Sequence, residues 1–252
     1  MLELRIENGE LKIMTLKKIY DFLNEISPFE LQEEWDNSGV NIGDFDKEIK
    51  KIYLSLDIDD GVVEEVEEGS LLITHHPLIF KGIKKVIPNR FSTKYLIRLI
   101  KKDVSLIAMH TNFDKTHLNT YFVEKVLGLN GEKDDFIFYS DIFMDFDELV
   151  KMIKEKMNLD ILRVVKANDF VKRIAVTTGS GMGLLDVIKA DCFLTGDIKY
   201  HEALDAKSRG ISLIDIGHYD SEKYFTDALY EEIKDLNIEI VKINSKNPFT
   251  FI

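Results

Sequence analysis

Residues 71–80 read LLITHHPLIF and place two adjacent histidines, His75 and His76, at the end of a short apolar run. The run predicts a buried strand of a parallel sheet. Inside such a strand, neighbouring side chains point to opposite faces, so the two imidazoles would not serve one site. Pro77 keeps the backbone of His76 extended and away from helix. If the strand ends at Thr74, both histidines lie beyond its carboxyl end, where α/β sheets bind ligands.

The same alternation of short apolar strands and helices extends along most of the chain. We expect strands near 52–56, 71–74, 104–109, 136–144, 162–166, 173–178, 192–195, 212–216 and 238–243. Between them we expect helices near 15–23, 61–68, 92–102, 118–127, 146–157, 183–190, 200–208 and 221–236. Repeated βα units of this kind predict an α/β protein.

The acidic, glycine-containing stretch 128–135 is the predicted boundary between two lobes. The first lobe would span 14–128 and the second 129–252. Residues 1–13 precede them as a predicted β-hairpin, because apolar residues alternate on both sides of Asn8-Gly9. The expected fold is therefore two interlinked α/β lobes with βα units and a small N-terminal extension.

Composition limits the functional classes. The chain has 252 residues, of which 45% are hydrophobic and 31% charged, as in ordinary globular proteins. No apolar run approaches the roughly 20 residues that span a bilayer. The single cysteine, Cys192, excludes an internal disulfide and indicates a reducing compartment, so we expect a cytoplasmic protein without membrane contact. The net charge of −12 argues against a surface that binds nucleic acid throughout.

Polar residues that bind metals follow four of the predicted strands. VSLIAM is followed by HTNFD at 110–114, CFLT by Gly196-Asp197, and SLIDI by GHYDSE at 217–222. Together with the first pair, this places four of the chain's 6 histidines at strand ends. Three histidines and two carboxylates exceed the three protein ligands of a catalytic zinc site and suit two metal ions. These five residues are His75, His76, Asp114, His218 and Glu222.

The metal and several neighbouring residues stay open at this point. Histidine and carboxylate ligands fit zinc, iron, manganese or cobalt. His110 either hydrogen-bonds a loop or supports the site, and Trp35 is interpreted as a core or loop-packing residue. From Lys81 to Lys102 eight residues are basic and none is acidic. This segment is a solvated helix face plus loop, or a rim that binds anions through Lys81, Lys84, Lys85 and Arg90.

As a set, these motifs resemble the dinuclear-metal GTP cyclohydrolase I type 2 family, also called NIF-three-like (NGG-interacting factor three-like). The similar stretches cover nearly the whole chain from Met14: WDNSGV at 35–40, HHP at 75–77, HTNFD at 110–114, AVTTGSG at 175–181, TGDIKYHEALDA at 195–206 and GHYDSE at 217–222. The resemblance implies the same five metal ligands, with Glu222 bridging two ions, and places His110 near them. It also implies ring-shaped homohexamers.

We therefore expect a metal-dependent hydrolase, cyclohydrolase-like or phosphoesterase-like, that acts on a nucleotide or similar small anionic substrate. Its dinuclear site would lie in the cleft between the lobes. Glu222, His201 and Asp197 are the candidates for catalysis and substrate contact. The alternative is a metal-containing ring that serves as a scaffold or regulator and binds nucleic acid or a protein partner. A purely structural zinc site is a third interpretation, against which the mixed histidine and carboxylate ligands argue.

Overall fold

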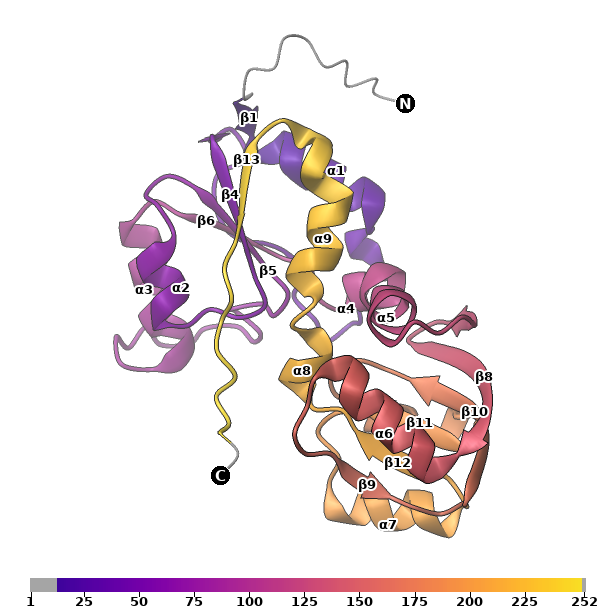
Figure 1. Ribbon diagram of the computed structural model, residues 1–252. Helices are drawn as coiled ribbons and strands as arrows, with labels where there is room; N and C mark the ends of the chain where they lie inside the picture. Colours follow the sequence, from indigo (N-terminus) through magenta and orange to yellow (C-terminus); the bar gives the residue numbers. More distant parts are fainter. Residues whose placement is uncertain (1–12, 251–252) are drawn as a thin grey trace. The chain divides into compact units, whose positions relative to one another are not determined.

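The computed structural model describes residues 13–250 (Figure 1). Contacts between Cα atoms divide the chain into two compact units. Unit 1 contains the residues up to Phe113 and those from Phe225 onward, whereas unit 2 runs from Asp114 to Tyr224. The hairpin predicted over residues 1–13 lies outside the described residues, apart from Ile13.

Unit 1 is built around a five-stranded sheet with the order β13–β4–β5–β6–β2. The first four strands are parallel and β2 pairs antiparallel with β6. All residues of the two central strands, β5 and β6, are buried, as expected where helices cover both faces of a sheet. The bounds are β2 Gly39–Ile42, β4 Lys51–Ser55, β5 Leu71–Thr74, β6 Ser105–Ala108 and β13 Glu239–Lys242.

Helices cover both faces of this sheet (Figure 1). On one face, α2 (Asp60–Glu65) and α3 (Phe91–Lys101) pack on side chains such as Leu72. The other face carries α1 (Leu16–Ile26) and α9 (Phe225–Ile233). The shorter elements of unit 1 are β1 Met14–Thr15, η1 Phe29–Leu31, β3 Glu48–Ile49, α4 Thr111–Phe113 and η5 Lys234–Leu236.

Unit 2 contains a six-stranded sheet with the order β7–β8–β10–β11–β12–β9. Only β10, β11 and β12 are parallel; the flanking strands run antiparallel to their neighbours. Alternate residues of β11 face opposite layers, so that Cys192 packs toward α6 and Phe193 toward α7. The bounds are β7 Glu132–Asp134, β8 Ile137–Asp145, α6 Phe146–Met157, β9 Arg163–Val165, β10 Phe170–Val176, η4 Met182–Val187, β11 Cys192–Thr195, α7 Tyr200–Ser208 and β12 Ser212–Asp215.

The division into units differs from the predicted boundary at 128–135. That stretch lies inside unit 2, and the segment from Phe225 returns to unit 1. The return is fixed by β13, which pairs parallel with β4 over four residues. A pairing between strands so distant in sequence cannot be inferred from local composition. The α/β class itself is confirmed, and the helices at 146–157 and 200–208 have the predicted bounds.

Two helical segments also differ from their predictions. The helix expected at 118–127 begins earlier, since α4 continues through η2 (Asp114–Leu118), α5 (Asn119–Tyr121) and η3 (Phe122–Leu127). The helix expected at 221–236 is interrupted, because α8 (His218–Glu222) ends before α9 starts at Phe225. Both departures coincide with the two places where the chain passes from one unit to the other.

Candidate metal centre

Three imidazoles cluster at the carboxyl ends of β5 and β6 in unit 1. His75 and His76 follow β5, and His110 follows β6. Their ring centroids are 5.0–5.4 Å apart, and one ring nitrogen of each lies within 4.8 Å of the others. His75 is fully buried, whereas the side chain of His76 is 24% exposed. The carboxyl ends of these two parallel strands therefore bring together two predicted ligands and His110, for which the sequence left a loop hydrogen bond and a supporting role open.

Each of these imidazoles is held through Nδ1. His75 Nδ1 donates to the carbonyl oxygen of Met109 at 2.8 Å, and His76 Nδ1 lies 2.7 Å from Asp57 Oδ1. His110 Nδ1 lies 2.7 Å from Asp36 Oδ1. Because a carbonyl oxygen can only accept, the proton of His75 is on Nδ1, and the carboxylates favour the same tautomer in the other two. Nε2 then carries the lone pair that binds a metal, with the oxygen acceptor orienting each ring.

Asp36 is the anchor of this cluster. Its side chain is fully buried and accepts from His110 Nδ1, from the Asn37 N–H at 2.7 Å and from Ser38 Oγ at 3.0 Å. It also accepts from both the N–H and the hydroxyl of Thr111, which starts α4. Burial by itself would raise the pKa of Asp36, but His110 and these hydrogen bonds hold that pKa well below its usual range.

In unit 2, His218 is held at both ring nitrogens. Nδ1 lies 2.7 Å from Asp197 Oδ2, and Nε2 lies 3.0 Å from Glu222 Oε2. The i,i+4 pair on α8 is the one expected from the sequence, and Glu222 is buried. Burial lowers the pKa of His218, but the two carboxylates outweigh burial and raise this pKa to about 10. The two carboxylates thus favour the positively charged form of His218. A bound divalent ion would instead favour the neutral form.

Two glycines allow the carboxylate of Glu222 and the start of α8 to lie where they do. A Cβ on Gly179 would lie 2.0 Å from Glu222 Oε1, and Gly179 has a φ of +63°. A Cβ on Gly196 would lie 2.6 Å from the backbone nitrogen of His218. Glycine at 179 therefore leaves the space that the Glu222 carboxylate occupies.

The remaining predicted residues are divided between the units. Asp114 begins η2, one residue beyond the unit 1 residue Phe113. Asp197 has a left-handed backbone, with φ of +56°, and its carboxylate orients His218. His201 is exposed near the start of α7, where its ring centroid is 5.3 Å from that of Tyr200. The catalytic roles of Asp197, His201 and Glu222 stay predictions.

The chain passes between units close to the histidine cluster of unit 1. It leaves unit 1 after Phe113 and re-enters it at Phe225. Within unit 1 these two rings are 5.3 Å apart, and the ring of Phe225 is 5.0 Å from that of His75. Asp114 is one residue from the first ring and Glu222 is three residues from the second.

The basic segment 81–102 has two parts with different roles. In the helical part, Lys94 and Arg98 pair with Asp60, and Lys102 Nζ donates to carbonyl oxygens at the end of α2, including that of Val66 at 2.6 Å. In the loop part, no ion pair within residues 13–250 involves the four predicted anion-binding side chains, all of which are exposed. These are Lys81, Lys84, Lys85 and Arg90. The loop part, and not the helical part, therefore remains the candidate for anion binding.

Sequence reasoning missed two carboxylates beside the cluster. Asp36 and Asp57 anchor histidines that lie 74 and 19 positions away, distances over which no local motif signals contact. Of the two interpretations of Trp35, loop packing is confirmed and a core position is wrong, because Trp35 is 56% exposed and packs on Phe80 of the loop after β5. Its ring centroid is 5.9 Å from that of His110 and 5.7 Å from that of Phe80, which is 42% exposed.

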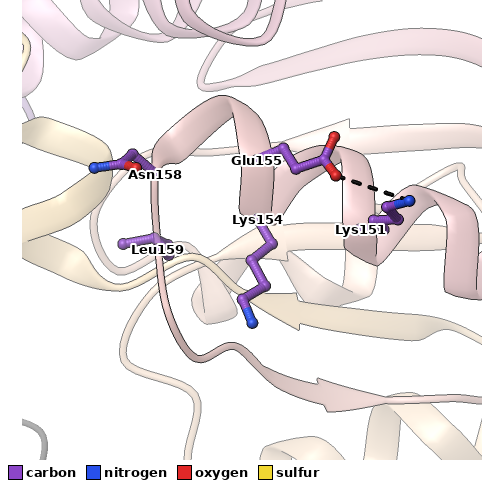
Figure 2. Close-up of a pocket in the computed structure, with 5 residues that line it drawn as sticks. All are labelled: Lys151, Lys154, Glu155, Asn158 and Leu159. Carbon is purple, nitrogen blue, oxygen red and sulfur yellow. Dashed lines mark ion pairs between the residues drawn. The ribbon is translucent and has the colours of Figure 1, made fainter.

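A surface depression at the end of α6 contains none of these residues. It is lined by the Lys151–Glu155 pair, 3.9 Å apart, together with Lys154, Asn158 and Leu159 (Figure 2). An exposed i,i+4 pair of this kind adds little to stability. Among the described residues, no helix is long and apolar enough to cross a membrane.

Nearly the whole chain is similar in sequence to a known protein family. Residues 14–248 match the family model described as Duf34/NIF3 (NGG1p interacting factor 3). A Campylobacter jejuni protein named GTP cyclohydrolase 1 type 2 homolog is 50% identical, covering 94% of this chain and 100% of its own. A Helicobacter pylori protein named GTP cyclohydrolase 1 type 2 is 42% identical, covering 94% and 99%.

Solved structures are similar over nearly the whole chain. A Staphylococcus aureus protein described as hypothetical has a TM-score of 0.85 and 31% identity, covering 96% of this chain and 100% of its own. Reduced HcgD from Methanocaldococcus jannaschii has a TM-score of 0.80 and 29% identity, covering 92% and 99%.

Proposed function

The chain belongs to the Duf34/NIF3 family, and from this premise we propose that it is a dinuclear metal-dependent hydrolase acting on a nucleotide or similar small anionic substrate. The observation that carries the proposal is the arrangement of four imidazoles, each with Nδ1 held by an oxygen acceptor. In His75, His76 and His110 a proton on Nδ1 places the lone pair on Nε2, as is typical of histidines around catalytic metals, whereas His218 also has Nε2 at 3.0 Å from Glu222 Oε2 and would have to lose a proton to bind a metal.

The proposed ligands come from both units. They are His75, His76, Asp114, His218 and Glu222, with Glu222 bridging the ions and His110 as a further ligand or a support. The covalent chain favours shared ligation, because Asp114 and Glu222 are one and three residues from the aromatic pair that packs beside His75. Histidine and carboxylate donors suit zinc, iron, manganese or cobalt.

The ions, when bound, would activate a water molecule and polarise the bond under attack. The chain's own residues have separate tasks. Asp57, Asp36 and Asp197 fix the tautomers of their histidines by accepting from Nδ1. His201 and Asp197 are candidates for proton transfer, and the cations of the loop after β5 would hold the anionic part of the substrate. Either a ring C–N bond or a phosphate ester could be the bond that is cleaved.

Metal content and turnover test this proposal together. Untagged protein should contain about two divalent ions per chain, and a variant with His76→Ala and Glu222→Ala should contain none. The exposed Glu155→Ala variant serves as a control for glutamate removal. Metal-loaded protein should release product from a nucleotide, and the names of the Helicobacter pylori relatives make GTP the first one to test. Retention of two ions by the double variant, or no turnover across a nucleotide and pterin screen, would overturn the proposal.

A metal-containing scaffold or regulator is the second candidate, favoured by the four loop cations without ion pairs among residues 13–250. If those cations bind nucleic acid, affinity should fall steeply as salt rises. Absence of DNA and RNA binding at low salt would exclude this form of the scaffold function. Homohexamer formation stays a prediction, which light scattering of the purified protein would test.

A further inference from the structure

The loop after β5 carries two features that the metal ligands do not explain. Phe80 is 42% exposed on this loop and lies against Trp35, which is 56% exposed. Lys81 is the next residue in the chain, and Lys84 and Lys85 follow after Gly82-Ile83. A stretch of 16 residues without helix or strand, from 75 to 90, separates β5 from α3. Loops of this length in compact units are commonly functional.

Hydrogen bonds fix the residue next to each of the two exposed aromatic residues. Trp35 precedes Asp36, whose buried carboxylate is fixed by the hydrogen bonds of His110 and Thr111. Next to Phe80, the N–H of Ile79 donates to Asn41 Oδ1 at 3.2 Å, and the carbonyl oxygen of Ile79 accepts from Asn37 Nδ2 at 2.5 Å. Rigid exposed aromatic rings bind a flat ligand at a low entropic cost.

The aromatic pair adjoins the metal-binding cluster. The ring of His110 is 5.9 Å from that of Trp35 and 6.3 Å from that of Phe80, and both contacts are edge-on. Since Trp35 and Phe80 are 5.7 Å apart, they already contact each other as an aromatic pair. A ligand ring would therefore stack on the outer surface that they form together, not between them.

We propose that Trp35 and Phe80 form a stacking surface for the planar heteroaromatic ring of the substrate, with Lys81, Lys84 and Lys85 binding its phosphates. The ligand of this surface is thus a nucleotide. That this nucleotide is hydrolysed rests on the proposed function, whereas its binding does not. Stacking accepts any flat ring, so it does not select one base. Binding of the phosphates by lysines makes the affinity for the nucleotide depend on salt. Purine and pterin nucleotides should therefore both bind, and the bare base or the bare phosphate should bind less tightly.

Trp35 is the only tryptophan and so reports directly on its own surface. The full chain, kept metal-free with EDTA, would be titrated with GTP, guanosine and inorganic triphosphate while its tryptophan emission is recorded. GTP and guanosine should quench the emission in a saturable way. Triphosphate should leave the emission unchanged and compete with GTP. Quenching of equal size by triphosphate, or none by GTP, would overturn the proposal.

Variants separate the two parts of the surface. Phe80→Ala should raise the Kd for GTP and guanosine about tenfold, the order expected for loss of one stacking partner. A variant with Lys84→Ala and Lys85→Ala should raise the Kd for GTP and reduce the salt dependence of GTP binding. Its Kd for guanosine should stay unchanged. Phe91→Ala and Lys94→Ala are matched controls, because Phe91 packs on Tyr95 and Lys94 pairs with Asp60. Equal effects in the controls would overturn the proposal.

Two further outcomes are distinguishable. If Phe80→Ala changes the oligomeric state and leaves the Kd for GTP unchanged, the aromatic pair is a contact between copies and the stacking proposal is wrong. If nucleotides quench Trp35 as expected but the metal-loaded protein hydrolyses none of them, stacking is supported and the hydrolase function fails. Binding in EDTA thus tests the surface without reference to the metal.

Discussion

The two units hold their histidines in different ways. In unit 1, three imidazoles cluster, and each is oriented by one acceptor at Nδ1. In unit 2, His218 has a carboxylate at each nitrogen, which raises its pKa to about 10. Unit 1 therefore holds imidazoles in the tautomer that a metal requires, whereas His218 must first lose a proton. If the proposed ions bind, we expect the unit 1 cluster to contribute most to metal affinity and His218 to make that affinity depend on pH.

The largest expected effect follows from removing the buried imidazole of unit 1. His75→Ala should abolish metal binding and also lower the free energy of unfolding by about 1–3 kcal/mol, because the Met109 carbonyl loses its buried donor. His76→Ala should abolish metal binding with a smaller loss of stability, since its side chain is 24% exposed. Elemental analysis and urea unfolding in EDTA measure both effects. Equal stability losses would contradict the assigned role of the Met109 hydrogen bond.

A change in unit 2 tests whether the Glu222 carboxylate needs the space beside Gly179. Gly179→Ala should displace Glu222 and lower the metal content, because the new Cβ would lie 2.0 Å from Oε1. Its positive φ adds a cost of about 1–3 kcal/mol in folding free energy. Gly183→Ala is the matched control, since no atom lies within 4 Å of a Cβ at that position. Full metal content in Gly179→Ala would show that Glu222 is not a ligand.

Smaller effects on metal binding are expected when the carboxylates that accept from the histidine Nδ1 atoms are replaced. Asp57→Asn in unit 1 and Asp197→Asn in unit 2 should each weaken metal binding by about 10- to 100-fold, because the amide orients the imidazole less well. Competition with a chelator measures these affinities. If only one of the two variants weakens binding, the histidine behind the other carboxylate is not a ligand.

The smallest effect concerns pH and the metal-free protein. The folded-state pKa of His218, about 10, lies above the unfolded value of about 6.5. Its contribution to stability is therefore complete below about pH 6.5 and is lost as pH rises through 10. In EDTA, the stability difference between wild type and His218→Gln should shrink from pH 6.5 to pH 9.5. A constant difference would show that the ion pair with Glu222 contributes nothing.

Several features followed from local sequence patterns. The helices at 146–157 and 200–208 and the strands at 71–74 and 192–195 have their predicted bounds, because apolar periodicity and flanking polar residues act over short distances. The clustering of His75, His76 and His110 followed from a rule about parallel strands. The start of α4 did not, since the acceptor for its first N–H is Asp36, 75 positions away in the chain. The pairing of β13 with β4 also depends on distant segments.

The sequence by itself determined the α/β class, the short buried strands and the histidines beyond their ends, because these depend on hydrophobic periodicity and on the directions of neighbouring residues. Tertiary structure alone decided which acceptor orients each imidazole, where the chain divides and which loop cations lack carboxylate partners among residues 13–250. It also decided that Trp35 is exposed beside His110. These properties arise from contacts between residues far apart in the chain, whose distances are set only when the sheets form.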